Sequence, residues 1–103
     1  MSTIFYQLEG IGKTKTRAHL IISGEVQGVM FRHETKRRAL NLNVKGWVRN
    51  RDNGTVEAVF EGEEQDVESM IVFCKRGPPG AIVTDVIVTP EKYVGEFDRF
   101  SVV

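Results

Sequence analysis

The sequence predicts one α+β domain, a two-layer sandwich in which two helices cover one face of a mostly antiparallel sheet. Three observations predict it: apolar residues switch between periods of two and about 3.6, an Asn-Gly turn joins two strand-like runs, and 103 residues suit one small domain. The expected order is βαββαβ plus a C-terminal edge strand. Residues 1–16 lack sustained periodicity and are expected to form a flexible N-terminal arm before a domain at 17–103.

Periodicity predicts the elements of the first half of the chain. Ala18–Ser23 places apolar residues alternately, as a strand does, and Phe31–Leu42 places apolar or small residues on one helical stripe. Val44–Asn50 and Thr55–Glu61 are strand-like runs on either side of the Asn-Gly turn, which is a strong hairpin signal. We therefore expect these two strands to be antiparallel neighbours.

The second half of the chain adds a helix and two strands. Glu63–Arg76 has acidic residues in its first turn, basic residues in its last turn and Gly77 after it, which is typical of a helix. Ala81–Val88 and Phe97–Val102 are the last two expected strands. This order of elements is the split βαβ pattern of a ferredoxin-like sandwich.

Composition limits the possible function classes. Lysine and arginine number 14, as do aspartate and glutamate, so the formal net charge is zero and no general affinity for nucleic acid is expected. Cys74, the single cysteine, excludes an internal disulfide and a multi-cysteine metal site, and its place in a helical apolar pattern predicts a small buried hydrophobe. The sequence contains no signal-peptide or membrane-spanning run, so a cytoplasmic location is expected.

Several charged and titratable side chains are expected to be ordinary surface groups. Lys36, Arg37 and Arg38 form the outer face of the first helix and should be turned away from the core and solvated. His19 should be half-buried on its strand, and His33 should be solvated early in the first helix. Two isolated histidines without a carboxylate cluster do not make a metal site, so no metal is expected.

The turn after the first strand has the features of an anion-binding site. Gly24–Arg32 reads Gly-Glu-Val-Gln-Gly-Val-Met-Phe-Arg and runs from the strand into the start of the first helix. Two glycines let backbone N–H groups converge, the helix N-terminus adds unpaired donors, and Arg32 adds a planar fork of donors that suits phosphate. Taken alone, a strand-to-helix turn that merely needs glycine explains these residues about equally well.

Topology is expected to bring Asn50 to this turn. The strands Ala18–Ser23 and Val44–Asn50 are joined through a helix, so they should run parallel by a right-handed crossover and end at the same edge of the sheet. Alternation puts Asn50 on the same face as Val48, which is the helix-covered face if that valine is in the core. The Asn50 amide should then point toward the turn, although asparagine also commonly starts a turn for its own sake.

Together these residues resemble the paired signatures of the acylphosphatase family. The matching segments are Gly24–Arg32, Gly46–Asn50 (Gly-Trp-Val-Arg-Asn), Asn53–Val56, Gly62, Arg76–Ala81, Gly95–Phe97 and Phe100. The resemblance covers roughly residues 17–103 and leaves out only the N-terminal arm. Met30 occupies a position at which many relatives have glycine or another small or variable residue, and its side chain is expected to narrow the approach to the anion site.

The resemblance implies an enzyme that hydrolyses the carboxyl–phosphate bond of acyl phosphates to a carboxylate and inorganic phosphate, without a metal or other cofactor. It implies two catalytic residues, Arg32 to bind the phosphoryl group and Asn50 to orient the attacking water. The expected phosphate-binding groups are the Arg32 side chain and the backbone N–H groups of Gln27, Gly28, Val29, Met30 and Phe31. The expected partners are a small-molecule acyl phosphate and its phosphate product, with no nucleic acid and no membrane, and the chain is expected to be a monomer.

Two other function classes use this fold. An RNA-binding module would stack bases on aromatic residues of the central strands, but the open face offers Trp47 beside His19, Ile21, Glu57 and Val59, which do not form a stacking platform. A regulatory module would bind phosphate or an acyl phosphate and release it unchanged. Such a binder has no need of Asn50 to orient water, and a turnover assay separates it from an enzyme.

Overall fold

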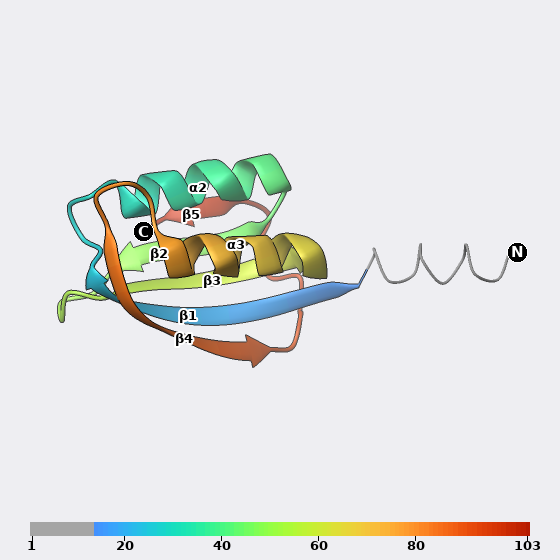
Figure 1. The fold of residues 1–103 in the computed structure, drawn as a ribbon. Coiled ribbons are helices and arrows are strands. Elements are labelled where there is room, and N and C mark those ends of the chain that lie inside the picture. The colour runs from blue at the N-terminus through green and yellow to red at the C-terminus, as the bar shows by residue number, and fades with distance from the viewer. Residues whose placement is uncertain (1–13) are drawn as a thin grey trace, which may run out of the picture.

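The computed structural model describes residues 14–103, and its architecture is the predicted sandwich (Figure 1). The elements in chain order are β1 (Lys15–Glu25), α2 (Phe31–Leu42), β2 (Lys45–Asn50), β3 (Val56–Glu63), α3 (Glu64–Arg76), β4 (Ile82–Glu91) and β5 (Phe100–Val102). Within residues 14–103, five strands form one sheet in the order β4-β1-β3-β2-β5, in which the β2–β5 pair is parallel and the other pairs are antiparallel. Figure 1 shows both helices on one face of this sheet, so the predicted fold class is confirmed.

Most of the predicted N-terminal arm, residues 1–13, lies outside the described residues. The last two residues of that predicted arm, Lys15 and Thr16, belong to β1, where they pair with Glu63 and Gly62 of β3. The strand therefore begins two residues before the expected start of the domain.

The helices match their predicted bounds more closely than the strands do. The bounds of α2 are those predicted, and α3 begins one residue later than expected because Glu63 is its N-cap. β4 continues through Pro90 to Glu91, beyond the predicted end at Val88. It lies at the edge of the sheet, where a proline without an N–H group is tolerated.

One apolar core lies between the helices and the sheet. Its fully buried side chains come from every layer, including Leu20 of β1, Val48 of β2 and Met70 of α3. The rings of Phe31 and Phe73, 5.9 Å apart, join the two helices.

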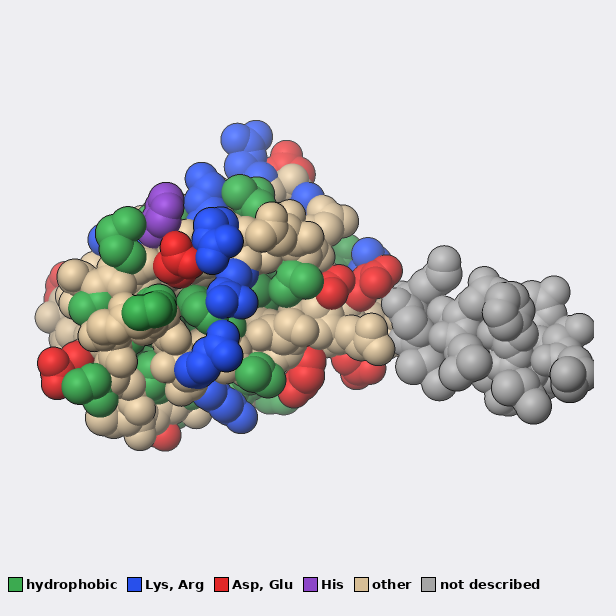
Figure 2. Space-filling view, turned by 45° about the horizontal axis from the view of Figure 1, so that its top comes forward, with side chains coloured by type: hydrophobic (Ala, Val, Ile, Leu, Met, Phe, Trp, Pro, Cys, Tyr) green, Lys and Arg blue, Asp and Glu red, His purple; other side chains and the backbone are tan. Residues whose placement is uncertain are grey.

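The prediction that three basic residues of α2 all face solvent is wrong for Arg38. The Arg38 guanidinium carbon lies 4.4 Å from the centre of the Phe73 ring, so the charge stacks on α3 instead of extending into water. Lys36 and Arg37 are exposed as predicted, and Arg37 pairs with Glu34 at 2.7 Å. In Figure 2 lysine and arginine side chains form a band across one face of the molecule.

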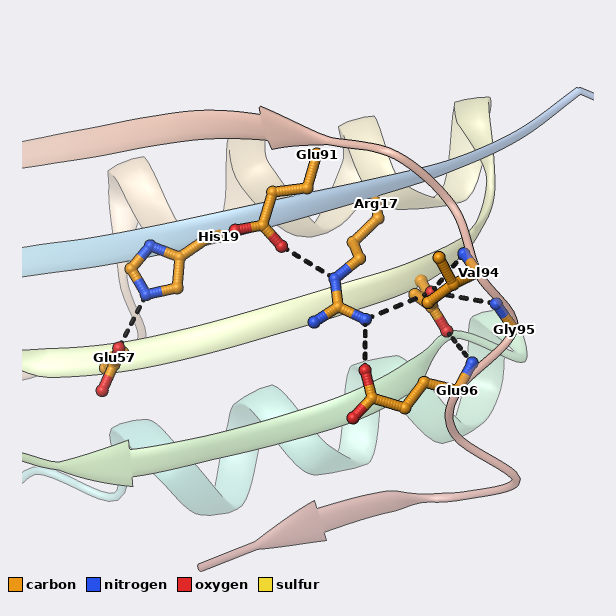
Figure 3. A network of polar contacts seen from close by, with 8 residues as sticks. Arg17, His19, Glu57, Glu91, Val94, Gly95 and Glu96 are labelled. Atoms are coloured by element: carbon orange, nitrogen blue, oxygen red, sulfur yellow. Dashed lines mark hydrogen bonds and ion pairs between the residues drawn. The ribbon is translucent and has the colours of Figure 1, made fainter.

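A buried carboxylate holds the segment between β4 and β5 (Figure 3). The side chain of Glu61, 1% exposed, accepts hydrogen bonds from the backbone N–H groups of Val94 at 3.0 Å, Gly95 at 3.2 Å and Glu96 at 3.0 Å. Because these N–H groups bind a carboxylate, residues 94–96 do not add to the sheet. β5 begins at Phe100, three residues after the predicted start at Phe97.

Arg17 joins this carboxylate to the end of β4. Its guanidinium lies 3.4 Å from Glu61, 2.8 Å from Glu91 and 2.7 Å from Glu96. Burial raises the pKa of Glu61, but the three backbone N–H groups and Arg17 together outweigh burial, and the net pKa is lowered. Glu61 therefore stays ionised in the folded protein.

Candidate active site

The strand register brings the anion-binding turn and Asn50 to the same edge of the sheet. Val56, the first residue of β3, pairs with Ile22 of β1 on one side and with Asn50 of β2 on the other. Both flanking strands are antiparallel to β3, so they run parallel to each other. β2 ends at Asn50, level with Ile22, and β1 continues three residues further to Glu25. The predicted meeting of these two strand ends is confirmed.

Arg32 and Asn50 line one cavity of about 470 Å³. The cavity lies between the turn after β1, the first turns of α2, and the ends of β2 and β5. Its lining residues are Val26, Gly28, Met30, Phe31, Arg32, His33, Lys36, Asn50 and Val102. The structure thus brings together both expected catalytic residues and three of the five expected loop residues.

The backbone N–H groups of the turn are available as donors. Within residues 14–103, the backbone N–H groups of residues 27–33 donate no hydrogen bond. The first backbone hydrogen bond of α2 is donated by the N–H of Glu34 to the carbonyl oxygen of Met30, at 3.0 Å. Unpaired N–H groups at a helix N-terminus favour an anion because the helix dipole adds positive potential there. The loop can therefore donate several hydrogen bonds to phosphoryl oxygens.

The two polar side chains expected to act on the substrate are also free to bind it. Arg32 and Asn50 are both half-buried, and neither side chain makes a hydrogen bond or ion pair with another residue in the described part of the chain. Of the described residues around the cavity, Arg32 and Lys36 are cationic and none is acidic. The site is locally positive although the chain as a whole has no net charge.

Met30 lies at the mouth of this cavity in a backbone conformation that is rare for a residue with a side chain. Its φ is 64° and its ψ 19°, in the left-handed region, and it forms the N-cap of α2. Its side chain is 63% exposed and lines the cavity. The sequence showed which residue stands there, but it gave no sign of this conformation.

Gly24 lets β1 pass close to β4 near the end of the strand. Its φ is 125°, and a Cβ atom at this position would lie 2.0 Å from the carbonyl oxygen of Ile82. The register of β1 against β4 shifts between Ser23 and Gly24. Only glycine allows β1 to pass so close to β4 at this shift, so the first residue of the motif has a structural role.

Gln27 and Val29 do not line the cavity. Val29 packs against the core, and the Gln27 side chain turns toward the β2–β3 hairpin. Sequence reasoning assigned only a backbone N–H group to Gln27 and missed this side-chain contact. Local pattern could not reveal it, because it joins residues 24 and 28 positions apart.

The histidines lie as predicted. His19 is half-buried on the open face of the sheet, where its Nε2 lies 2.6 Å from Glu57 Oε2 (Figure 3), and His33 is exposed at the cavity. Within residues 14–103 there is no group of three or more His, Cys, Asp or Glu side chains able to hold a metal ion. In the same residues, no helix has the length and apolar character needed to cross a membrane.

Residues 14–103 form a ferredoxin-like sandwich in which N–H donors, an arginine and an asparagine that bind no other described residue surround one cavity. This combination defines a small anion-binding domain of the phosphate-handling class. The acylphosphatase family model matches residues 18–102. The chain belongs to the acylphosphatase family.

Individual relatives cover nearly the whole described domain. The acylphosphatase of Pelotomaculum thermopropionicum is 51% identical over 89 residues, which are 86% of this chain and 97% of that protein. The acylphosphatase of Haloarcula marismortui is 54% identical over 87 residues, covering 84% and 94% respectively. The crystal structure of acylphosphatase from Bacillus subtilis matches with a TM-score of 0.81 and 39% identity over 85% of this chain and 98% of that chain. The predicted family and enzyme class are confirmed.

Proposed function

We propose that Arg32 and the N–H groups of residues 27–31 hold the phosphoryl group of the acyl phosphate, and that Asn50 positions the water that attacks phosphorus. One observation carries this assignment: the Arg32 and Asn50 side chains line the same cavity and bind no other described residue. As an acylphosphatase, the protein hydrolyses the carboxyl–phosphate bond.

The chemistry needs electrostatic stabilisation more than it needs an acid or a base. Water oxygen forms a bond to phosphorus while the bond from phosphorus to the carboxyl oxygen breaks, and the leaving group departs as a carboxylate. Negative charge is spread over the three equatorial phosphoryl oxygens, where fixed N–H groups and the Arg32 guanidinium stabilise it. The carboxylate is a weak base and leaves without protonation, and the substrate phosphate accepts the proton of the water.

The amide of Asn50 suits the remaining task of orienting water. Its oxygen accepts a hydrogen bond from the water, and its NH₂ group donates to a neighbouring oxygen. Holding the nucleophile in line with the breaking bond lowers the entropic part of the barrier. These groups bind the phosphoryl oxygens and the attacking water directly, so we propose that the reaction needs no metal ion.

Alanine variants of the two residues test the assignment with benzoyl phosphate as substrate and EDTA present. Arg32→Ala should lose both turnover and the affinity for inorganic phosphate, because it removes the charged group that binds the phosphoryl oxygens. Asn50→Ala should lower kcat by roughly 100- to 1,000-fold and keep most of the phosphate affinity.

Arg37→Ala is the matched control, since Arg37 is an exposed arginine of the same helix that does not line the cavity. It should keep the parent rate. A near-parent rate in either site variant contradicts the role assigned to that residue.

We further propose that the protein acts as a cytoplasmic monomer with small-molecule partners only. The groups assigned to the reaction all come from one chain, so the proposed site needs no residue of a second copy, and the single buried cysteine suits a reducing compartment. Sedimentation equilibrium tests the oligomeric state, and a stable dimer contradicts it.

A further inference from the structure

The side-chain amide of Gln27 joins the anion-binding loop to the β2–β3 hairpin. Its Nε2 donates to the backbone carbonyl of Arg51 at 2.8 Å and to that of Thr55 at 3.0 Å, and the contact is partly buried. These are the only hydrogen bonds within residues 14–103 between the loop at residues 26–30 and the hairpin turn at residues 51–55.

The two carbonyl groups that accept from Gln27 are the ones that close the hairpin turn. Arg51 O also accepts from the N–H of Gly54 at 3.1 Å, and Thr55 O accepts from the N–H of Arg51 at 2.8 Å. The side-chain amide of Gln27 therefore binds both ends of the hairpin turn. One nitrogen reaches both acceptors because the glutamine amide carries two N–H donors.

The hairpin turn at residues 51–55 begins directly after Asn50. The Asn50 side chain makes no hydrogen bond with any described residue, so its position follows from its backbone. The backbone is held to β3 through the pairing of Asn50 with Val56, and it is held to the phosphate-binding side of the cavity through Gln27. The Gln27 amide thus sets the spacing between the loop and Asn50.

We propose that Gln27 is a positioning residue for acyl phosphate hydrolysis. Its amide fixes the separation between the phosphate-binding loop and Asn50, so that the attacking water lies in line with the phosphorus–oxygen bond that breaks. This inference rests on the proposed role of Asn50. In-line attack is sensitive to such spacing, since a misplacement of about 1 Å costs on the order of 100-fold in rate.

Gln27→Met keeps the length of the side chain and removes both donors. With benzoyl phosphate, kcat should fall by about 10- to 100-fold. Competitive inhibition by inorganic phosphate should change by less than about threefold, because the loop N–H groups and Arg32 remain. Circular dichroism and a thermal melt establish that the variant is folded at the assay temperature. If Gln27→Met does not fold, Gln27→Ala takes its place with the same expectations.

Asn53→Ala is the matched control in the same turn. It removes two hydrogen bonds, those that Asn53 Oδ1 accepts from the backbone N–H of Thr55 at 3.1 Å and from its hydroxyl at 2.7 Å, and it does not touch the loop. It should lower the melting temperature and leave kcat within about twofold. An equal loss of kcat in Asn53→Ala means that any loosening of the hairpin slows turnover, which overturns the proposal.

The double variant with Asn50→Ala tests whether Gln27 acts through Asn50. If it does, adding Gln27→Met to Asn50→Ala should lower kcat no further, because the positioned group is already gone. A multiplicative loss in the double variant, or a folded Gln27→Met with parent kcat, overturns the inference while the proposed function stands. Parent kcat in Asn50→Ala alone overturns the proposed function instead.

Discussion

The backbone of Met30 is in a conformation that most side chains avoid, and substitutions there should affect stability according to their branching. Met30→Val should lower the free energy of unfolding by about 1–2 kcal/mol, since a β-branched residue is strained at a φ of 64°. Met30→Gly should change it by less than about 1 kcal/mol, because relief of strain offsets the greater freedom of the unfolded chain. Urea denaturation measures both, and equal stability of the valine variant contradicts this account.

Cys74 should be chemically silent in the folded protein. It is fully buried on α3, and burial raises the pKa of its thiol, so the reactive thiolate is disfavoured even in mildly alkaline solution. A thiol reagent such as dithionitrobenzoate should not react at pH 8 until a denaturant is added, after which it should label one thiol per chain. Rapid labelling of the native protein contradicts the burial of Cys74.

At the scale of single residues, the sequence predicts what local pattern and topology determine. Arg32 and Asn50 follow from a turn motif, alternation and a crossover rule, and the structure places both at one cavity. The side-chain contacts of Gln27 and Arg38 were not predicted. Each depends on a partner that is distant in the sequence, a pair of hairpin carbonyls for Gln27 and the Phe73 ring for Arg38.

At the scale of elements, helix ends are more predictable than strand ends because their signals are local. Charges, caps and a following glycine determine α3 almost to the residue. The ends of β4 and β5 depend on the neighbours that each segment finds. Pro90 is tolerated because β4 is an edge strand, and the N–H groups of residues 94–96, between β4 and β5, bind Glu61 and no neighbouring strand.

The close passage of β1 and β4 should make Gly24 irreplaceable. Gly24→Ala places a methyl group 2.0 Å from a backbone oxygen that cannot move without shifting β4. We expect a loss of roughly 3 kcal/mol or more of unfolding free energy, measured by urea denaturation. Gly54→Ala is the control. Gly54 also has a positive φ, of 89°, but apart from its chain neighbours no described residue has an atom within 4 Å of its added Cβ, so the loss should be about 1 kcal/mol. Equal losses in the two variants contradict a steric origin.

At the scale of the whole molecule, the Glu61 carboxylate links β3 to the segment before β5, and its ionisation should contribute to stability. Its folded pKa lies below its ordinary value near 4.5. The contribution is therefore fully present above pH 4.5 and is lost as the pH falls through the lower, folded pKa. Glu61→Gln should lower the unfolding free energy at pH 7 by about 2–4 kcal/mol.

Urea denaturation between pH 2.5 and pH 7 measures this effect. The fall in stability below pH 4.5 should be shallower in Glu61→Gln, though not absent, because the pKa values of Glu34 and Glu57 are also lowered. The exposed Glu64→Gln is the control and should keep the parent slope. A parent slope in Glu61→Gln as well contradicts the assigned role. The kcat of both variants should be unchanged at pH 7, since Glu61 lies five residues along β3 from Val56, about 17 Å from the site.

The shared pairing of Val56 with Ile22 and Asn50 makes enzyme activity a measure of correct strand alignment. A slip of β2 by one residue against β3 preserves nearly all of the secondary structure but turns Asn50 to the opposite face of the sheet. Far-ultraviolet circular dichroism cannot distinguish such a chain from the native one. Recovery of turnover during refolding therefore reports how much of the population has reached the native alignment, which recovery of helix and sheet signal alone does not.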